Sequence, residues 1–580
     1  MFSKRWILKD SPDPDQAEIL AEALSTSHPF PSVLAEILLQ RNITTFEEAR
    51  KFFLPDSIPL HDPMLMADMD LAVHRLIKAR EKKERVLLYG DYDVDGTSAV
   101  TMLSLFLEDW AYDFDFYIPD RYAEGYGVSF QGIDYAVKIG AALIVSLDCG
   151  IKAHDKVRYA NSKGIDFIIC DHHTPAASLP EAVAVLDPMR KDDAYPYKYL
   201  TGCGVGFKLA QALSFQLQAS GFTPPTQDYD PLARYSDLVA LSIACDIVPI
   251  TGENRAIAFA GMKKLQENPL PGIKALMDQA GESRQWDISD LVFFVGPRVN
   301  AAGRLGHARD AVQVLLGKDA ELKHLAEDLQ VSNDERKGLD KEITTQALAM
   351  IAADPAYAQK HTTVLTRDDW HKGVIGIVAS RLIERHYRPT ILLTESEGKL
   401  VGSARSVPGF DLYQALEACE EYLVRFGGHK YAAGMTLKPE DFPAFCKKFD
   451  EVVGKTIHQD QKIPVLYIDR ELRFSQINAR FIRLLQRMAP FGPENRKPVF
   501  RSRRVKVMNS RLLKEVHLKL VLEQENGMYE AIGFGLGEKW AHLPEPPQWI
   551  DIAYQPMFNT WNGRTTINLR LKDFEPSHEA

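Results

Sequence analysis

The sequence has 580 residues and a formal net charge of −10, with 45% hydrophobic and 26% charged residues. These values are ordinary for a soluble globular protein, and at roughly 100–200 residues per domain they predict about three to five domains. They exclude recognition of nucleic acid through overall charge, so any basic surface must be local.

The chain carries no signal for a membrane or for secretion. No apolar run is long enough to span a bilayer, and the first residues, MFSKRWILKDSPDPD, lack the apolar core of a signal peptide. The six cysteines form no C-x-x-C pair. We therefore expect a cytoplasmic protein with reduced thiols and no membrane partner.

The N-terminal half predicts an α/β domain. Residues 1–60 have apolar residues at helical spacing and predict a short helical lead-in. Over residues 61–315, strand-like and helix-like segments alternate, which predicts a parallel sheet with helices on both faces. The expected strands are 85–90, 114–119, 142–148, 165–170 and 182–188, and the expected helices are 97–108, 129–139 and 151–163.

The C-terminal half predicts three further parts. Residues 316–355 are charged and nearly free of turn residues, which predicts a long connecting helix. Residues 356–460 alternate again and predict a smaller α/β domain. From residue 461 to 580 the pattern has period two, with a hairpin signal at Asn562-Gly563, and predicts an all-β barrel of the OB-fold type.

The barrel segment holds positive charge that the overall composition hides. Residues 496–519 contain nine Lys or Arg against one acid, Glu515. Phe500 and Trp561 offer stacking faces, and a basic groove with aromatic side chains is how OB-folds hold single strands. The alternative interpretation is a solvated strand face.

A cluster of like charges follows the first expected strand. LLYGDYDVDGTSAV, residues 87–100, places Asp91, Asp93 and Asp95 within five positions. Such crowding is unfavourable unless a cation lies among the carboxylates. An EF-hand is excluded, because its twelfth position is Met102 and the motif follows a strand. A haloacid-dehalogenase phosphatase fits poorly, since its nucleophile comes directly off the strand, and a solvated acidic turn is the plainest alternative.

The same kind of residue recurs after other apolar runs. IVSLDCG ends an expected strand with Asp148, FIICDHH ends another with Asp171, His172 and His173, and LSIACDIVP places Asp246 in an apolar context. The carboxyl ends of strands are where open α/β sheets bind ligands. Five aspartates with one or two histidines suit Mg²⁺ or Mn²⁺ and disfavour structural zinc. These residues predict a phosphoesterase with two metal ions.

These motifs resemble the DHH phosphoesterase superfamily. The signature DHH stands at 171–173, after DYDVDG and SLDCG. VGSARS (401–406) and FGGHKYAAG (426–434) resemble the companion DHHA1 domain. GPRVNAAGRLG (296–306) and LLQRMAPFGPENRKPVF (484–500) resemble the superfamily members that degrade single-stranded DNA. The resemblance runs from about residue 50 to the end.

The resemblance implies a 5′→3′ exonuclease of DNA repair and recombination that releases 5′-mononucleotides, with two divalent cations, Mn²⁺ or Mg²⁺. It assigns Asp91, Asp93 and Asp148 to one ion. It assigns Asp95, His172 and Asp246, with Asp148 bridging, to the other. Many members begin the first motif with His, whereas this chain has Asp91.

The resemblance also implies residues for catalysis and substrate. Asp171 and His173 belong to the catalytic centre, where His173 contacts the scissile phosphate or holds a metal ligand in place. Ser403 and Arg405 receive the 5′ phosphate, because an Arg fork binds phosphate oxygens bidentately. The other expected substrate contacts are Arg121 as a second clamp, Gly427 and Gly428 before His429, and Arg298, Asn300 and Arg304 along the strand path. A structural ion pair is an equal alternative for the last three.

Two other functions stay open at this point. One is a DHH enzyme for small substrates, such as an oligoribonuclease, pyrophosphatase or cyclic-dinucleotide phosphodiesterase. The other is a non-catalytic DNA-binding relative. The resemblance further implies single-stranded DNA as substrate, a narrow passage between the DHH and DHHA1 domains that excludes duplex, a monomer, and single-strand-binding protein and a RecQ-type helicase as partners.

Overall fold

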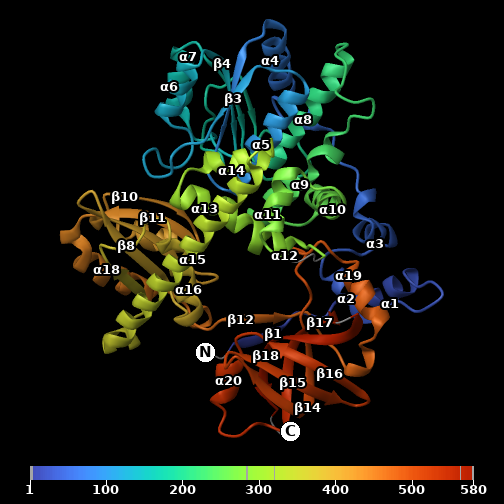
Figure 1. The fold of residues 1–580 in the computed structure, drawn as a ribbon. Coiled ribbons are helices and arrows are strands. Elements are labelled where there is room, and N and C mark those ends of the chain that lie inside the picture. The colour runs from blue at the N-terminus through green and yellow to red at the C-terminus, as the bar shows by residue number, and fades with distance from the viewer. Residues whose placement is uncertain (1–3, 282–284, 319, 562, 578–580) are drawn as a thin grey trace. The chain divides into compact units, whose positions relative to one another are not determined.

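A computed structural model describes residues 4–281, 285–318, 320–561 and 563–577, without the side chain of Trp561. The chain forms two compact units, here called unit 1 and unit 2 (Figure 1). Unit 2 contains Thr45–Asp334 and Met488–Lys497. Unit 1 contains Met1–Thr44, Glu335–Arg487 and Pro498–Ala580.

Unit 2 is built on a five-stranded sheet of order β3-β2-β4-β5-β6. All neighbouring strands are parallel, as the alternating sequence predicts. The strands are β2 (Arg85–Gly90), β3 (Phe114–Tyr117), β4 (Ala141–Leu147), β5 (Asp166–Cys170) and β6 (Ala184–Leu186).

Helices cover both faces of this sheet (Figure 1). Leu87 and Ile144 pack with α6 (Phe130–Lys138) and α7 (His154–Ser162) in one buried cluster. Leu88 and Val145 point to the other face, into a cluster with α5 (Val94–Asp109) and α8 (Gly202–Ala219). Alternate residues of a strand point to opposite faces, so near-continuous apolar strands are buried on both sides.

The rest of unit 2 is helical. Its elements are α3 (Phe46–Phe53), η1 (Pro55–Ser57), η2 (Pro63–Leu65), α4 (Met69–Lys82), α9 (Pro231–Cys245), α10 (Gly252–Glu267), α11 (Pro271–Asp278), α12 (Ile288–Asp290), η3 (Leu291–Val295), α13 (Gly296–Leu305) and α14 (Ala308–Leu316). The long helix expected after residue 316 is α15 (Leu322–Ala353), and the boundary between the two units falls within it.

Unit 1 contains a second, mixed sheet of order β10-β11-β9-β8-β7. Only β7 and β8 pair in parallel among these strands. The elements are η4 (Pro355–Ala358), β7 (Thr363–Thr366), α16 (Ile375–Arg385), β8 (Thr390–Ser396), β9 (Lys399–Arg405), α17 (Leu412–Glu417), η5 (Glu420–Tyr422), β10 (Arg425–His429), β11 (Ala432–Leu437), η6 (Pro439–Asp441) and α18 (Phe442–Thr456).

Unit 1 also contains a closed five-stranded barrel with the pairing β14-β15-β16-β18-β17 and β17 back to β14. The pair β16–β18 is parallel and the other pairs are antiparallel. This confirms the predicted OB-type barrel. Trp561 pairs with Arg564 across the expected hairpin, of which Asn562 lies outside the described residues. The strands are β14 (Phe500–Leu513), β15 (His517–Gln524), β16 (Gly527–Gly533), β17 (Trp549–Trp561) and β18 (Arg564–Pro576).

Shorter elements accompany the barrel. They are η7 (Gln459–Gln461), β13 (Arg470–Glu471), η8 (Phe474–Gln476), α19 (Ala479–Gln486) and α20 (Gly537–Ala541).

The N-terminal segment is not purely helical, so the predicted helical lead-in is wrong in part. Before α1 (Pro14–Ala23) and α2 (Ser32–Leu39), β1 (Arg5–Leu8) pairs in parallel with β12 (Val465–Ile468). The Trp6 indole N–H donates to Asp573 at 2.9 Å. A four-residue strand has too little periodicity to show in sequence, and its partner lies far along the chain.

Two further observations concern the whole described chain. No helix in the described ranges is long and apolar enough to cross a membrane. The six cysteines are all free thiols, and four of them are buried.

Candidate active site

The aspartate turn joins β2 to α5. Asp93 caps the helix, and its Oδ1 accepts hydrogen bonds from the backbone N–H groups of Asp95 (2.9 Å) and Gly96 (3.1 Å). A Cβ on Gly96 would lie 2.4 Å from the carbonyl oxygen of Asp91, so only glycine allows the helix to start this close to the turn. Asp91 and Asp95 are thereby almost fully buried.

Asp148 follows β4 in a left-handed conformation, with φ of 61°. It lies against Gly202, the first residue of α8, where a Cβ would be only 2.4 Å from the Cβ of Asp148. Sequence reasoning missed Gly202, although the glycines of the GCGVG run (202–206) could have indicated that another backbone comes close at this point. This glycine lets the start of α8 reach the metal-binding residues.

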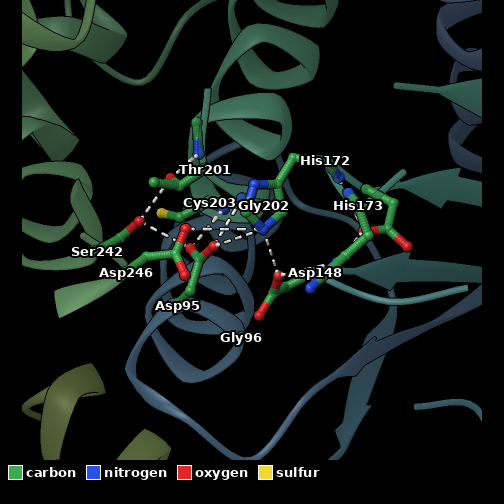
Figure 2. Close-up of polar contacts among 12 residues, drawn as sticks. Asp95, Gly96, Asp148, His172, His173, Thr201, Gly202, Cys203, Ser242 and Asp246 are labelled. Atoms are coloured by element: carbon green, nitrogen blue, oxygen red, sulfur yellow. Dashed lines mark hydrogen bonds and ion pairs between the residues drawn. The ribbon is translucent and has the colours of Figure 1, made fainter. Parts of the chain in front are cut away.

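The carboxylate of Asp95 is held by the start of α8 (Figure 2). It accepts hydrogen bonds from the N–H groups of Gly202 (2.7 Å) and Cys203 (2.8 Å) and from the hydroxyl of Ser242 (2.7 Å). Ser242 is itself 2.6 Å from the hydroxyl of Thr201. The partial positive charge of a helix N-terminus favours a carboxylate at this place. Sequence reasoning missed the three partners of Asp95 and also Thr201, which contacts Ser242.

His172 lies among three carboxylates (Figure 2). Its Nε2 is 3.2 Å from Asp148, 3.7 Å from Asp246 and 3.8 Å from Asp95. Burial lowers the pKa of His172, which favours the neutral imidazole that can ligate a metal. Its Nε2 is buried and makes no hydrogen bond with the described residues.

Asp246 lies at the end of a helix, whereas the sequence suggested the end of a strand. It is the C-cap of helix α9 and does not follow a strand of the sheet. The next residue, Ile247, has φ of 61° and is 71% exposed. β-Branched residues rarely adopt this left-handed conformation, because it costs conformational energy. Here such a residue directly follows a candidate metal ligand.

The geometry groups these side chains into candidate metal sites. Ligand atoms lie within 4.8 Å of one another in three sets: Asp91, Asp93 and Asp148; Asp95, His172 and Asp246; and Asp148, His172 and His173. The first set equals the three residues expected at one ion. The second contains three of the four expected at the other, with Asp148 close by through His172.

The electrostatics of the cluster fit divalent cations. Burial and neighbouring carboxylates raise the pKa of Asp91 and of Asp148 well above the usual range, and raise that of Asp246 to about 8. The Oδ1 atoms of Asp91 and Asp148 are buried without a hydrogen-bond partner among the described residues. Buried acceptors left unpaired are costly, and hard cations such as Mg²⁺ and Mn²⁺ satisfy such oxygens.

His173 is oriented by two neighbours rather than by the carboxylate cluster. Its Nδ1 is 2.7 Å from Oδ1 of Asp171, and its Nε2 is 3.1 Å from the hydroxyl of Tyr126. Burial lowers the pKa of His173, but the hydrogen bond and charge of Asp171 outweigh it and raise this pKa to about 9. Asp171 also accepts from the N–H of Ile151 at 2.9 Å. Tyr126 is a contact that sequence reasoning missed.

The structure separates Arg121, the expected second clamp, from the three residues expected along the strand path. The guanidinium of Arg121 lies 4.8 Å from the ring centre of Tyr92. Its charge offsets part of the rise in the pKa of Asp91 that burial and Asp93 cause, so Arg121 lies near the cluster. Asn300 and Arg304 are partly exposed on α13. Arg298 is only 5% exposed and donates to the carbonyls of Phe294 and Gln279. Arg298 therefore holds the fold together and does not line a strand path.

Ser403 and Arg405 lie together on β9, as their two-residue spacing predicts. The guanidinium of Arg405 donates to the Ser403 hydroxyl at 3.0 Å. A Cβ on Gly376 would lie 2.7 Å from Oγ of Ser403 and 2.9 Å from Nη2 of Arg405. Gly376 is in the first turn of α16. A hydroxyl, a guanidinium and a helix N-terminus meet here, which is a favourable arrangement for a phosphate.

The glycine motif lies on the neighbouring strands. Gly427 pairs with Gly434, which pairs with Ser403, and His429 pairs with Ala432, which pairs with Arg405. Directly paired residues share one face of a sheet. Because Gly427 and Gly434 have no side chains, the face of the sheet beside Ser403 is open. Gly428 has φ of 145°, a backbone conformation that favours glycine. The motif is a strand at the sheet edge, not a loop.

The barrel places its aromatic side chains differently from the sequence-based expectation. Phe500 is fully buried in the barrel core against Phe481 and Tyr554, so it offers no stacking face. The side chain of Trp561 lies outside the described residues. Trp549 is 39% exposed, and the guanidinium of Arg504 lies 6.0 Å from its ring centre.

The basic run is partly neutralised by acids that are distant in sequence. Glu471 forms ion pairs with Arg501 and Arg503. Glu530 lies 3.0 Å from Lys519. The positive surface is therefore weaker than the linear count of residues 496–519 suggests.

The parallel sheet and its acidic cluster define a metal-dependent phosphoesterase, and comparisons with known proteins specify which one. Residues 85–243 match the DHH family N-terminal domain, residues 358–455 the DHHA1 domain and residues 468–573 the RecJ OB domain. The chain belongs to the RecJ family of single-stranded-DNA-specific exonucleases, and it is a metal-dependent hydrolase.

Individual relatives support this membership over most of the chain. The chain is 34% identical over 575 residues to RecJ of Bacillus subtilis strain 168, covering 98% of this chain and 70% of that protein. It is 32% identical over 526 residues to RecJ of Escherichia coli K12, covering 88% and 91%. The crystal structure of RecJ with Mn²⁺ from Thermus thermophilus superposes with a TM-score of 0.83 at 26% identity, covering 99% of this chain and 80% of that one. The same protein has also been solved with Mg²⁺.

Proposed function

We propose that this chain hydrolyses single-stranded DNA from the 5′ end and releases 5′-mononucleotides, using two divalent cations, Mn²⁺ or Mg²⁺, in DNA repair and recombination. The observation that carries the proposal is the set of buried acceptor atoms of Asp91, Asp148 and His172, which converge without hydrogen-bond partners among the described residues. Such a site is unfavourable without cations, and a pair of cations suits phosphodiester hydrolysis.

The proposed ligands follow the clusters described above. Asp91, Asp93 and Asp148 would hold one ion, and Asp95, His172 and Asp246 the other, with Asp148 near both. When bound, the two cations neutralise charge on the phosphate and lower the pKa of water. The amides of α8 hold Asp95 in place, so this carboxylate needs no reorganisation when the cations bind.

His173 serves as the proton donor or positive charge beside the scissile phosphate. Asp171 fixes its Nδ1 and favours the imidazolium, leaving Nε2 as the atom that faces Tyr126 and, in our proposal, the substrate. Tyr126 positions this ring from the exposed side. Arg121 adds a further cation near Asp91 and is proposed to contact a phosphate oxygen.

Polarity is proposed to come from Ser403 and Arg405. A metal centre alone does not distinguish one end of a strand from the other. The hydroxyl, the guanidinium and the start of α16 offer a terminal phosphate several donors at one place. Gly427, Gly428 and His429 border the open face of the same sheet and would let the strand approach.

The barrel is proposed to bind the single strand beyond the active site. A closed OB-type barrel with exposed Trp549 and basic β14 offers stacking and phosphate contacts. A short substrate needs no such domain, which disfavours an enzyme for small substrates. The intact metal-binding residues disfavour a non-catalytic relative.

The proposal includes the cellular setting of the reaction. We propose that the chain acts on DNA in the cytoplasm as a monomer. Its proposed protein partners are single-strand-binding protein and a RecQ-type helicase. These partners rest on the family resemblance alone.

One digestion experiment tests the function. Single-stranded DNA, duplex DNA and RNA, each labelled at the 5′ or the 3′ end, are incubated with Mn²⁺, Mg²⁺ or EDTA. We expect mononucleotides to appear first from the 5′ end of single-stranded DNA, and no products in EDTA. Release from the 3′ end, or hydrolysis of dinucleotides without hydrolysis of longer strands, would contradict the proposal.

A further inference from the structure

A cavity in unit 1 has no part in the function proposed above. Its volume is about 550 Å³, within the range of roughly 300–1,000 Å³ that is typical of ligand pockets. It lies at the C-terminal end of α16, where His386 and Arg388 line it. Ser403 and Arg405 lie at the opposite end of this helix, which has 11 residues and is therefore about 16 Å long.

The walls of this cavity carry a net positive charge from Lys360, Arg388 and Lys462. Five basic side chains line it, against the single carboxylate of Asp354: Lys360, His361, His386, Arg388 and Lys462. They come from segments that are distant in sequence, between the end of α15 and the residue that follows η7. Chance clustering on one helix face does not account for this convergence.

These positive charges are only partly matched by anions, since Asp450 acts on Arg388 alone among them. Lys360 is 4.0 Å from Asp354, at the limit of an ion pair, and Lys462 has no ion-pair partner within the described part of the chain. Burial and the neighbouring cations Arg388 and Arg385 lower the pKa of His386. An anion in the cavity would remove this mutual repulsion.

The cationic groups are also held in place. Arg388 donates to the carbonyls of Tyr357 and Lys360, both at 2.7 Å, and to the hydroxyl of Thr363 at 2.9 Å. Nζ of Lys360 lies 4.0 Å from the ring centre of Tyr357. Arg388 and Lys360 are therefore held before an anion binds, which lowers the cost of ordering this part of the wall.

The rest of the lining is apolar. Ile351, Tyr357, Tyr387 and Ile457 contribute side chains, and two of them, Ile351 and Ile457, are less than a tenth exposed. A simple inorganic anion would leave the partly exposed rings of Tyr357 and Tyr387 in contact with water. A ligand that carries a flat ring or a sugar next to its charge would cover them and gain from the burial.

We propose that this cavity binds a nucleotide: its phosphate lies among Lys360, His386 and Lys462, and its base or sugar lies against the apolar wall. The nucleotide could be a free 5′-mononucleotide or one unit of a DNA strand, because the chemistry is the same. The proposal does not depend on the function proposed above.

Calorimetric titration of the full chain in EDTA tests the proposal, because removal of divalent ions prevents turnover. The Arg405→Ala variant is used throughout, so that the proposed 5′-phosphate site does not contribute. The ligands are dGMP, deoxyguanosine, inorganic phosphate and a ten-nucleotide strand without a 5′ phosphate. A strand that binds more tightly than dGMP, and loses affinity in the same variants, would identify a strand as the source.

We expect dGMP to bind more tightly than deoxyguanosine or phosphate alone. Lys462→Ala and His386→Ala should each weaken dGMP binding about tenfold or more, the usual effect of losing a charge-assisted hydrogen bond. Lys399→Ala, which removes an exposed lysine of β9 outside the cavity, should change it less than about twofold. Thermal unfolding checks that each variant is folded. If Lys462→Ala is unstable, Lys462→Gln replaces it.

Three outcomes would overturn the proposal. One is the absence of dGMP binding up to millimolar concentration. Another is equal affinity for dGMP and for phosphate or deoxyguanosine, which would mean a plain anion site or a plain apolar one. The third is unchanged dGMP affinity in folded Lys462 and His386 variants.

Discussion

Gly202 lies against Asp148 so closely that a Cβ on the glycine would be 2.4 Å from the Cβ of the aspartate and 2.8 Å from its Oδ1 (Figure 2). This contact joins the end of β4 to the start of α8. It explains how amides of α8 reach Asp95, the carboxylate they hold.

Gly202→Ala should therefore damage the active site more than the fold. The added methyl group displaces Asp148 or α8, and overpacking of this kind costs about 1–3 kcal/mol of stability. We expect at least a hundredfold loss of nuclease activity, with the far-ultraviolet circular dichroism retained. Gly338→Ala is the matched control, since its Cβ would meet no atom within 4 Å and α15 should gain helix propensity. Equal activity of the two variants would contradict the role of Gly202.

Asp148→Asn tests the electrostatic cost of the cluster. Asn keeps the size of the side chain and tolerates the left-handed backbone. It removes a carboxyl group whose burial beside other carboxylates is unfavourable, because that group must either carry a buried charge or take up a proton. In EDTA the variant should melt at a higher temperature than the unaltered protein. Added Mn²⁺ should raise the melting temperature of the unaltered protein but raise that of the variant much less. Activity should fall below detection, and an unchanged Mn²⁺ response would contradict the assignment of Asp148 as a ligand.

Tyr126→Phe removes the hydroxyl that contacts Nε2 of His173. Loss of one hydrogen bond to the charged imidazolium is typically worth about 1.5–3 kcal/mol, so we expect kcat to fall roughly ten- to a hundredfold. Stability should not change, because Tyr126 is 56% exposed. Tyr199→Phe, at a tyrosine that is 54% exposed elsewhere in unit 2, is the control and should leave kcat unchanged. A lower melting temperature with normal kcat would show that Tyr126 serves the fold alone.

Arg405→Ala should act through the 5′ phosphate. On 5′-phosphorylated strands we expect kcat/KM to fall about ten- to a hundredfold, the value of a charge-assisted hydrogen bond of ~1.5–3 kcal/mol. On 5′-hydroxyl strands the change should do much less, because the contact is already missing. Gly376→Ala should reproduce this pattern, since its Cβ would collide with Ser403 and Arg405. Equal losses on both kinds of strand would assign Arg405 to the fold or to the general strand path.

Ile247→Gly should separate stability from activity. Glycine relieves the left-handed strain of about 1–2 kcal/mol, which offsets its greater entropy in the unfolded chain, so the free energy of unfolding should not fall. The exposed side chain stands next to Asp246, so its loss should raise KM for single-stranded DNA. Ile247→Val keeps the branched apolar surface and should restore KM. A normal KM in the glycine variant would show that Ile247 does not contact substrate.

Much of the metal centre can be predicted from sequence, because parallel strands place their carboxyl ends at one edge of a sheet. Asp91, Asp148 and Asp171 each follow an apolar run, and local patterning is enough to bring them together. The same reasoning predicts the two sheets and the closed barrel from the change of period along the chain. Ser403 and Arg405 share a face because a strand has a period of two.

Tertiary packing decided the rest, because no local pattern records which distant segments meet. Asp246 reaches the cluster from a helix end. Gly202 and Ser242 meet Asp95, with Thr201 beside Ser242, only when α8 and α9 pack together. Phe500 looked like a stacking face but is buried, and Glu471 neutralises two arginines of the basic run. Composition counts charges along the chain, whereas burial and pairing depend on three-dimensional neighbours, and those are set by the fold as a whole.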